Sequence, residues 1–486
     1  MADIKGESRM LIDGELIASA ATFDNINPAT GEVLGTASDG TVEDVKRAVA
    51  AARRAFDETG WSRDHAFRRR CLEQLHAALE KHKEEFRGVL VAEGGSPLAI
   101  TYSVQIDEAI GGFPFFVELA DTYAYERDLG QKPSAGLPSN ARTVREPVGV
   151  VAAVTPFNFP LMLTLNKIGP ALAAGCTVIH KAAPETPWTG ALLGRLVAEE
   201  TDIPAGVFNV ITTSNDAVSE ALVTDPGVDM VTFTGSTATG KRILAATADQ
   251  IKRVHLELGG KSAAILLDDA DFATAIGMLA TMACAHSGQA CARHTRMLVP
   301  RARYDEGVEL AAAIFSGLAA GDPTDVNVLH GPQITAQQRD TVLAQIERAQ
   351  AEGARVAARG SKPEGNGGFW VEPTLLVDVA PGSAAAQEEI FGPVLAVMPY
   401  EDEAEAIRIA NDSSYGLSGG VWSADEQRAL EVARRIRAGT VAINLSMFVH
   451  PAWPFGGYKE SGLGREGGIE GFEEFLEVKL VTTPGT

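Results

Sequence analysis

One of the four cysteines has surroundings that suit a nucleophile. Cys291 follows Ser287-Gly288-Gln289-Ala290 and precedes Ala292-Arg293. A glycine and small neighbours would leave the sulfur accessible, and a nearby arginine with helix-terminus amides would lower the pKa of the thiol. The alternative is a buried, inert thiol, which is the commoner fate of a free cysteine. The other three cysteines lie in apolar helices or strands and are predicted to be core residues: Cys71, Cys176 and Cys284.

Two further polar residues stand where they could assist such a nucleophile. Glu257 ends an otherwise apolar strand, and desolvation there would raise the pKa of its carboxyl, as a general base requires. It could instead form a buried salt bridge with Lys261 or Lys167. Asn158 lies between two phenylalanines and two prolines, where its amide could donate to an oxyanion. A turn-forming asparagine is the structural alternative.

A glycine-bounded segment favours a phosphate-binding helix start. Gly235 to Lys241 follows a predicted strand, opens a predicted helix and has the spacing G-x-x-x-x-G-K. Arg242 stands where a P-loop has Ser or Thr for magnesium, so a nucleotide without its own magnesium fits better than a nucleotide hydrolase. A plain helix cap is the alternative. Lys181, at the end of another strand, could meet a ligand or reach solvent.

Regular alternation of strands and helices must position these residues. Short apolar runs predict buried parallel strands, with helices of about ten residues between them. Right-handed crossovers then give a doubly wound sheet whose carboxyl ends share one edge. The residues after the strands, Pro156 to Asn158, Lys181, Gly235 to Thr237 and Gly259-Gly260, should therefore meet at one crevice. The predicted strands are Val148–Val154, Thr177–His180, Val207–Ile211, Met230–Phe233 and Val254–Leu256.

The rest of the chain completes an α/β protein with more than one domain. Residues 41–58 form a predicted amphipathic helix with a capping box at Thr41 and Asp44. Residues 129–139, rich in Gly, Pro and Ser, predict an excursion away from a core. A second α/β alternation runs from Ala263 to about Asn444. With 486 residues, two or three domains are expected.

Composition excludes several classes of function. A net charge of -22 argues against nucleic acid as a partner. No apolar run reaches the roughly 18 residues of a membrane span, and the start of the chain lacks the layout of a secretory signal, so a cytoplasmic protein is expected. Four cysteines without a C-x-x-C motif favour neither disulfides nor zinc. The nine histidines show no ligand spacing, so no metal site is predicted.

Over nearly its whole length the chain resembles the aldehyde dehydrogenase superfamily. Several motifs occur in the order typical of that family, with Glu257 and Cys291 at its usual spacing. The motifs are Glu146-Pro-Val-Gly149, Thr155-Pro-Phe-Asn-Phe-Pro160, Phe233-Thr-Gly-Ser-Thr237, Glu257-Leu-Gly-Gly-Lys261, Gly288-Gln-Ala-Cys291, Gly368-Phe-Trp-Val-Glu-Pro-Thr374, Glu388-Glu-Ile-Phe-Gly-Pro393 and Pro454-Phe-Gly-Gly-Tyr-Lys-Glu-Ser-Gly462.

The resemblance implies roles for these residues. Cys291 would attack an aldehyde, Asn158 and the Cys291 amide would hold the oxyanion, and Glu257 would activate water to hydrolyse the thioester. Lys167 would belong to the same catalytic group. Because relatives that use coenzyme A typically lack the carboxylate of Glu257, its presence implies a free acid as product. The implied cofactor-binding residues are Thr155, Pro156, Phe157, Lys181, Phe233, Gly235, Ser236, Leu258, Gly259, Gln338, Glu389 and Phe391.

The resemblance also implies a substrate tunnel and a cofactor. A mostly apolar tunnel would accept a hydrophobic aldehyde, medium-chain or aromatic, and its implied residues are Phe159, Leu163, Phe448, Val449 and Phe455. NAD is the expected cofactor and NADP the alternative, because Pro184 stands where NAD-preferring relatives often have a glutamate, with Glu185 one residue later. Cys284 and His286 stand where the family often has Phe and Asn, which alters the tunnel lining.

The family's architecture implies a fold class and domain boundaries. The fold class is α/β, with two doubly wound parallel-sheet domains and a small β oligomerisation element. Residues 1–122 and 147–256 would bind the dinucleotide, and residues 257–455 would form the catalytic domain. A hairpin at 123–146 and a tail at 456–486 would join subunits into a homodimer or homotetramer. Two other readings are a P-loop-like hydrolase and a non-catalytic relative, the second disfavoured because Cys291 and Glu257 are both present.

Overall fold

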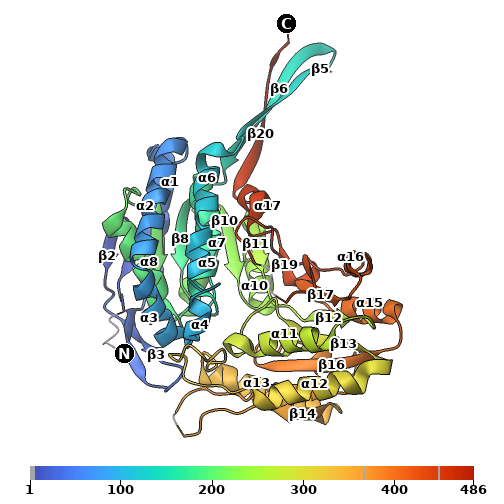
Figure 1. Ribbon diagram of the computed structural model, residues 1–486. Coiled ribbons are helices and arrows are strands. Elements are labelled where there is room, and N and C mark those ends of the chain that lie inside the picture. The colour runs from blue at the N-terminus through green and yellow to red at the C-terminus, as the bar shows by residue number, and fades with distance from the viewer. Residues whose placement is uncertain (1–5, 366, 447–448, 486) are drawn as a thin grey trace.

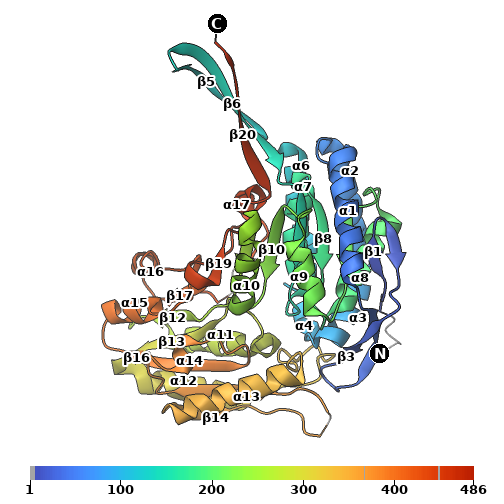
Figure 2. The ribbon, with the colours of Figure 1, turned by 180° about the vertical axis from the view of Figure 1, so that it is seen from behind.

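Two largely parallel sheets and a projecting arm make up the molecule (Figures 1 and 2). The computed structural model describes residues 6–365, 367–446 and 449–485. Within these ranges no helix is both long and apolar enough to cross a membrane. Both sheets carry helices on their faces, which confirms the predicted α/β class with two doubly wound sheets.

The first sheet has eight strands in the order β19-β11-β10-β7-β8-β9-β1-β2. Its five central strands are parallel to one another, as the sequence predicts. They are β7 (Val150–Val154), β8 (Thr177–Lys181), β9 (Phe208–Ile211), β10 (Met230–Thr234) and β11 (Arg253–Glu257). The antiparallel edge strands are β1 (Met10–Ile12), β2 (Glu15–Ile17) and β19 (Gly462–Leu463).

Helices cover both faces of the first sheet because its central strands are apolar on both sides. In β7, Val151 and Ala153 join one core cluster, and Val150, Ala152 and Val154 join the other. The predicted helix at 41–58 is α1, with the capping box of Thr41 and Asp44. The helices are α1 (Val42–Glu58), α2 (His65–Lys81), α3 (Lys83–Gly94), α4 (Leu98–Thr101), α5 (Asp107–Gly112), α6 (Pro114–Thr122), α7 (Pro160–Ala174), α8 (Pro187–Glu200), α9 (Asp216–Thr224), α10 (Thr237–Thr247) and the 3₁₀ turn η1 (Ala248–Gln250).

The second sheet follows the first in the chain, in the order β14-β15-β16-β13-β12-β17-β18. Only β14 (Arg355–Arg359) is antiparallel among its described strands. The parallel strands are β12 (Ser262–Leu266), β13 (His294–Pro300), β15 (Thr374–Val377), β16 (Val394–Tyr400), β17 (Ser418–Trp422) and β18 (Thr440–Ile443). Its helices are α11 (Phe272–Cys284), η2 (Ala285–Gly288), η3 (Arg301–Arg303), α12 (Tyr304–Gly317), α13 (Ala336–Ala351), α14 (Ala384–Gln387), α15 (Glu403–Asn411) and α16 (Glu426–Ala433).

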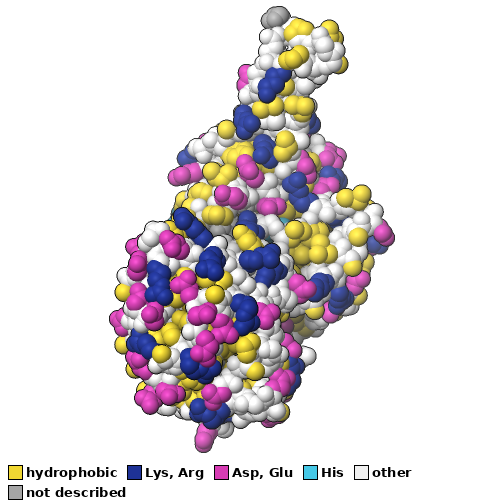
Figure 3. All heavy atoms as spheres, turned by 90° about the vertical axis from the view of Figure 1, so that its right-hand side faces the viewer, with side chains coloured by type: hydrophobic (Ala, Val, Ile, Leu, Met, Phe, Trp, Pro, Cys, Tyr) yellow, Lys and Arg dark blue, Asp and Glu magenta, His cyan; other side chains and the backbone are white. Residues whose placement is uncertain are grey.

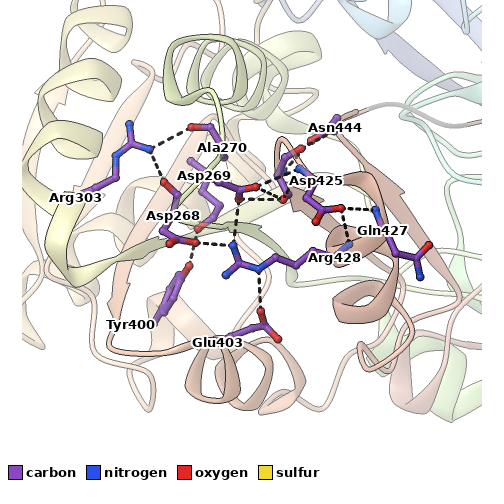
Figure 4. Close-up of polar contacts among 12 residues, drawn as sticks. Asp268, Asp269, Ala270, Arg303, Tyr400, Glu403, Asp425, Gln427, Arg428 and Asn444 are labelled. Atoms are coloured by element: carbon purple, nitrogen blue, oxygen red, sulfur yellow. Dashed lines mark hydrogen bonds and ion pairs between the residues drawn. The ribbon is translucent and has the colours of Figure 1, made fainter.

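The carboxyl ends of the second sheet are occupied by an ion-pair network. Arg428 lies 2.7 Å from Asp268, which follows β12, and 3.3 Å from Glu403, which follows β16 (Figure 4). Asp269 accepts hydrogen bonds from the hydroxyl of Ser423 at 2.7 and 2.9 Å. These contacts tie the strand ends together. The opposite, amino ends of the sheet adjoin the first sheet, because β12 begins only five residues after β11 ends.

The predicted excursion at 129–139 is the tip of a long hairpin. Strands β5 (Glu126–Ser134) and β6 (Leu137–Pro147) pair with each other, and the tail strand β20 (Leu476–Pro484) adds to β6. The three strands extend beyond both sheets as a narrow arm (Figures 1 and 2). The remaining elements are the hairpin β3 (Thr22–Ile26) with β4 (Val33–Ser38), the turn η4 (Lys459–Ser461) and α17 (Gly468–Glu473).

Candidate active site

The strand ends named from the sequence share one edge of the first sheet. The neighbouring strands β11, β10, β7 and β8 are parallel, so the segments after them emerge on the same side. The loop after β11 reaches the second sheet, because a Cβ placed on Gly260 would lie 2.7 Å from the carbonyl oxygen of Cys291. The loop carrying Cys291 therefore lies against the end of the strand that carries Glu257.

Cys291 lies in the loop before β13 and lines a cavity of about 240 Å³. It is the only partly exposed cysteine, since the other three are buried. Burial raises the pKa of its thiol to about 12, and Glu389, Glu257 and Glu466 add to that rise. The expectation of a lowered pKa is thus wrong. Cys291 stands between η2 and β13 and does not begin a helix, and burial with three carboxyl groups prevails over Arg293.

Glu257 is a buried carboxyl group that forms no ion pair with any lysine of the described residues. Its side chain is at the end of β11 and 2% exposed, and neither oxygen has a hydrogen-bond partner among the described residues. Burial raises the pKa of this carboxyl well above its usual value, and the negative charge of Glu466 raises it further. The alternative of a salt bridge to Lys261 or Lys167 is wrong. Lys167 pairs with Glu466, and the one charged-group contact of Glu257 among the described residues is with His255.

A buried lysine lies beneath Glu257. Lys167, on α7, is fully buried and contacts Glu466 through an ion pair. Its ammonium group also donates a hydrogen bond to the hydroxyl of Thr232 on β10, at 3.2 Å. Lys167 therefore acts on Glu257 through its charge, which favours the carboxylate form, and not through a direct contact.

Asn158 is held in place from both ends. Its side-chain amide donates to the backbone oxygen of Gln289 at 2.9 Å, which leaves its second N–H for another acceptor. Its backbone oxygen accepts from the side chains of Gln105, at 2.8 Å, and His286, at 2.7 Å. Gln289 is two residues before Cys291, so this amide is anchored beside the nucleophile's own loop.

The glycine-bounded segment after β10 begins α10 as predicted. The hydroxyl of Ser236 accepts a hydrogen bond from the amide of Thr239, so Ser236 caps the helix as the structural alternative predicts. The other amides of the first turn stay available to a ligand. Lys241 instead pairs with Glu460, at 2.9 Å, and not with its own loop. A P-loop lysine would have to reach the phosphates, and so this contact disfavours the nucleotide hydrolase reading.

A second cavity, of about 140 Å³, lies beside α10 and has both apolar and charged walls. Phe233 and Ile243 form part of its apolar lining, and Asp216 of α9 lies at its rim. Its position next to the capped start of α10 places an apolar slot beside amides that suit a phosphate. This arrangement fits the adenosine end of a dinucleotide.

Lys181 ends β8 as an 8% exposed side chain, which excludes free extension into solvent. Burial lowers the pKa of its ammonium group, while the carboxyl of Glu185 opposes that shift. Glu389 accepts from the amide of Gly260 at 3.1 Å, and burial raises the pKa of this carboxyl to about 7. Gln338 donates to the backbone oxygen of Phe391 at 3.1 Å.

The other residues expected to contact a cofactor differ in exposure. Thr155, Leu258 and Gly259 are buried, Pro156, Phe157 and Gly235 are half-buried, and Ser236 is exposed. Phe157 packs edge-on against Phe391, with 6.1 Å between the ring centroids. That pair, together with Glu389, connects the end of β7 to the segment before β16. The residues predicted to bind a cofactor therefore come from both sheets.

Four of the predicted tunnel residues line the cavity at Cys291: Phe159, Leu163, Val449 and Phe455. Phe448 lies outside the described residues. The rest of the lining is mostly apolar and includes Ile100, Met162 and Trp453. The described lining residues also include the basic side chain of Arg293 and the acidic side chain of Glu466.

Sequence reasoning missed three residues of the site. His255 precedes Glu257 by two positions on one strand, so strand alternation could have placed both on one face. Gln105 and Glu466 had no such signal. Glu466 is 299 residues from its partner Lys167, and no local pattern connects the two.

Comparison with known proteins agrees with this geometry. The model of the aldehyde dehydrogenase family matches residues 17–481. A 3-succinoylsemialdehyde-pyridine dehydrogenase from a Pseudomonas species is 42% identical over 476 residues, covering 97% of each chain. These matches establish the class: the chain belongs to the aldehyde dehydrogenase family.

Solved structures of the family superpose over almost the whole chain. A Mycobacterium tuberculosis aldehyde dehydrogenase, solved with NAD+, has a TM-score of 0.93 and 40% identity, covering 98% of each chain. A mutant of aldehyde dehydrogenase C from Pseudomonas syringae, solved with NAD+ and octanal, has a TM-score of 0.91 and 38% identity, covering 98% of this chain and 96% of that one.

Proposed function

We propose that this chain oxidises apolar aldehydes to carboxylic acids with NAD as hydride acceptor. The observation that carries the proposal is that Cys291 lines an apolar cavity. The same residue lies next to the strand end that bears Glu257, whose carboxyl has no hydrogen-bond partner among the described residues. A nucleophile, a base and an apolar substrate space thus adjoin one another. Octanal in the Pseudomonas syringae relative supports an apolar substrate.

The chain's own groups account for both halves of the reaction. After the Cys291 thiol loses its proton to water, the thiolate sulfur bonds to the aldehyde carbon, and the free N–H of Asn158 stabilises the oxyanion that forms. When bound, a nicotinamide dinucleotide supplies the hydride acceptor, and the product of that step is a thioester on Cys291. Glu257 then takes a proton from water, whose oxygen attacks the thioester and releases the acid and the cysteine thiolate.

The residues around the second cavity fit the cofactor. Ser236 and the first-turn amides of α10 would bind the pyrophosphate, and Lys181 with Glu389 would bind the riboses. The carboxyl of Glu185 lies close enough to Lys181 to oppose the lowering of that lysine's pKa, and Asp216 lines the second cavity. With Glu220 of the cavity lining, three carboxyl groups there outnumber the cations Lys181 and Arg242. The excess of negative charge would repel the additional phosphate of NADP, which favours NAD.

An aldehyde panel run with NAD and NADP separately tests this proposal. We expect formation of reduced nicotinamide with NAD, and kcat/KM rising about fourfold for each methylene added within the cavity. Cys291→Ala should lower turnover more than about 1,000-fold, whereas Cys71→Ala, the same change at a buried thiol, should leave it unchanged. Faster turnover of small charged semialdehydes than of medium-chain or aromatic aldehydes would contradict the substrate class.

We also propose that copies of this chain associate through the arm formed by β5, β6 and β20. The support is the exposure of apolar side chains on strands that no helix covers. Residues 123–146 and 456–486, including this arm, remain the predicted oligomerisation elements. The two sheets remain the predicted dinucleotide-binding and catalytic domains.

A further inference from the structure

His255 and Glu257 form an isolated pair inside the first sheet. They are alternate residues of β11 and project from the same face, where they are 1% and 2% exposed. The Nε2 atom of His255 lies 3.5 Å from Oε1 of Glu257. Neither atom has a hydrogen-bond partner among the described residues. Because an unmet buried polar group is costly, each is the other's available partner.

The neighbouring strand determines which nitrogen of His255 carries the proton. Lys167, which has donors only, donates to the hydroxyl oxygen of Thr232 at 3.2 Å. The same oxygen lies 2.9 Å from Nδ1 of His255. No other acceptor for the Thr232 hydroxyl is found in the described part of the chain, so its proton points to Nδ1. The Nε2 atom must then carry hydrogen and face Glu257.

Burial and the surrounding charges keep the imidazole neutral. Burial lowers its pKa well below the usual value, and the positive groups of Lys167 on α7 and Arg465 in the segment after β19 lower it further. The carboxyl groups of Glu466, in the segment after β19, and Glu474, at the end of α17, act on Glu257. A neutral donor can hold the Glu257 carboxylate without adding a buried charge.

We propose that His255 is a positioning residue for Glu257, donating its Nε2 hydrogen to Oε1 and so leaving Oε2 for water. Lys167 supports this arrangement through Thr232. In the hydrolysis step, Oε2 takes one proton from water, the new C–O bond forms at the thioester carbon, and the C–S bond breaks to return Cys291 as thiolate. The role rests on the proposed function, because it requires that water attacks a thioester.

Two His255 variants separate positioning from packing. His255→Leu removes the donor at similar volume, and His255→Gln keeps an N–H at a comparable reach. With NAD and a medium-chain aldehyde, we expect His255→Leu to keep a rapid burst of reduced nicotinamide and to lose about 10- to 100-fold in steady-state kcat. Losing a donor to the carboxylate raises the pKa of Glu257, so the acidic limb of kcat should move up by about one pH unit. His255→Gln should recover most of both.

Thr232→Val gives the same test without removing the histidine, and Thr177→Val, at a buried threonine of β8, is its matched control. We expect an upward shift of the acidic limb for Thr232→Val and none for Thr177→Val, with thermal unfolding measured for each. Equal pH profiles for wild type, His255→Leu and Thr232→Val would overturn the role of His255. A wild-type protein that forms no reduced nicotinamide from any aldehyde would overturn the proposed function instead.

Discussion

At the scale of the residue, the ionisation of Cys291 determines its reactivity. With a pKa of about 12, the thiol is almost entirely protonated at pH 8. Alkylation by iodoacetamide should then be about 1,000-fold slower than for a thiol with a pKa near 9, and its rate should rise about tenfold per pH unit up to about pH 11. Mass spectrometry of the Cys291 peptide without cofactor measures this, and a rate that levels off below pH 9 would disprove it.

The matched variants for this measurement are adjacent glutamates. Glu389 raises the pKa of Cys291, so Glu389→Gln should lower that pKa and accelerate alkylation at pH 8. Glu388 forms an ion pair with Arg348 and is not among the groups that shift the thiol, so Glu388→Gln should have no effect. Equal acceleration by both variants would point to altered exposure in place of altered charge.

The sequence predicts which residue types could do chemistry, but not the charges that surround them. Cys291 and Glu257 stand out because of their immediate neighbours along the chain. The carboxyl groups that raise the pKa of Cys291 include Glu389 and Glu466, which come from distant segments. Electrostatic environment depends on distances in space, and so the direction of that pKa shift could be found only from the fold.

At the scale of the element, the segment after β18 packs closely against the carboxyl of Glu257 at Gly456. A Cβ on Gly456 would lie 2.6 Å from Oε1 of Glu257, and the φ of Gly456 is 156°. Gly456→Ala should displace the carboxyl, lower kcat about 100-fold and destabilise the fold by about 1–3 kcal/mol. Urea unfolding and steady-state rates measure the two effects.

Gly353 is the control for backbone strain alone. Its φ is 103° and a Cβ there would meet nothing within 4 Å. Gly353→Ala should therefore destabilise the protein without changing kcat. An unchanged kcat for Gly456→Ala would show that Glu257 tolerates the displacement.

The sequence predicts those helices and strands whose pattern of apolar and capping residues lies within one continuous segment. The capping box and apolar stripe of α1, and the apolar runs of β7 to β11, are complete within single segments. Strand β19, in contrast, is two residues long and pairs with β11, which lies about 200 residues earlier in the chain. So short a strand has no periodicity, and its place in the first sheet follows only from tertiary packing.

At the scale of the whole molecule, chain order does not reveal how the two sheets face each other. The carboxyl-end rule places the site correctly for the first sheet. In the second sheet the carboxyl ends carry the Arg428 network (Figure 4). Cys291 and Glu389 precede β13 and β16, at the amino ends. The pattern of strands is the same in both sheets, so only the fold shows which end of the second sheet contributes to the site.

Among the described residues, the arm exposes apolar side chains on strands that no further layer covers. Leu137, Val478 and Leu480 are 68%, 56% and 61% exposed, and apolar side chains appear on the arm in Figure 3. Both outer strands also have unpaired backbone groups, and a three-stranded sheet with no layer over it has no core. A second copy of the chain would bury these side chains.

Charges placed on one face of β20 test this association. Val478 and Leu480 are alternate residues, so Val478→Asp with Leu480→Asp puts two carboxylates on a single face of the strand. Sedimentation velocity should show an oligomer for wild type and a monomer for the double variant, because burying two charges outweighs the remaining apolar contact. Thr483→Asp adds a carboxylate to the opposite face and should leave the oligomer intact. A wild-type protein that sediments as a monomer at micromolar concentration would refute the arm's role, since its apolar strands would then be stable in water alone.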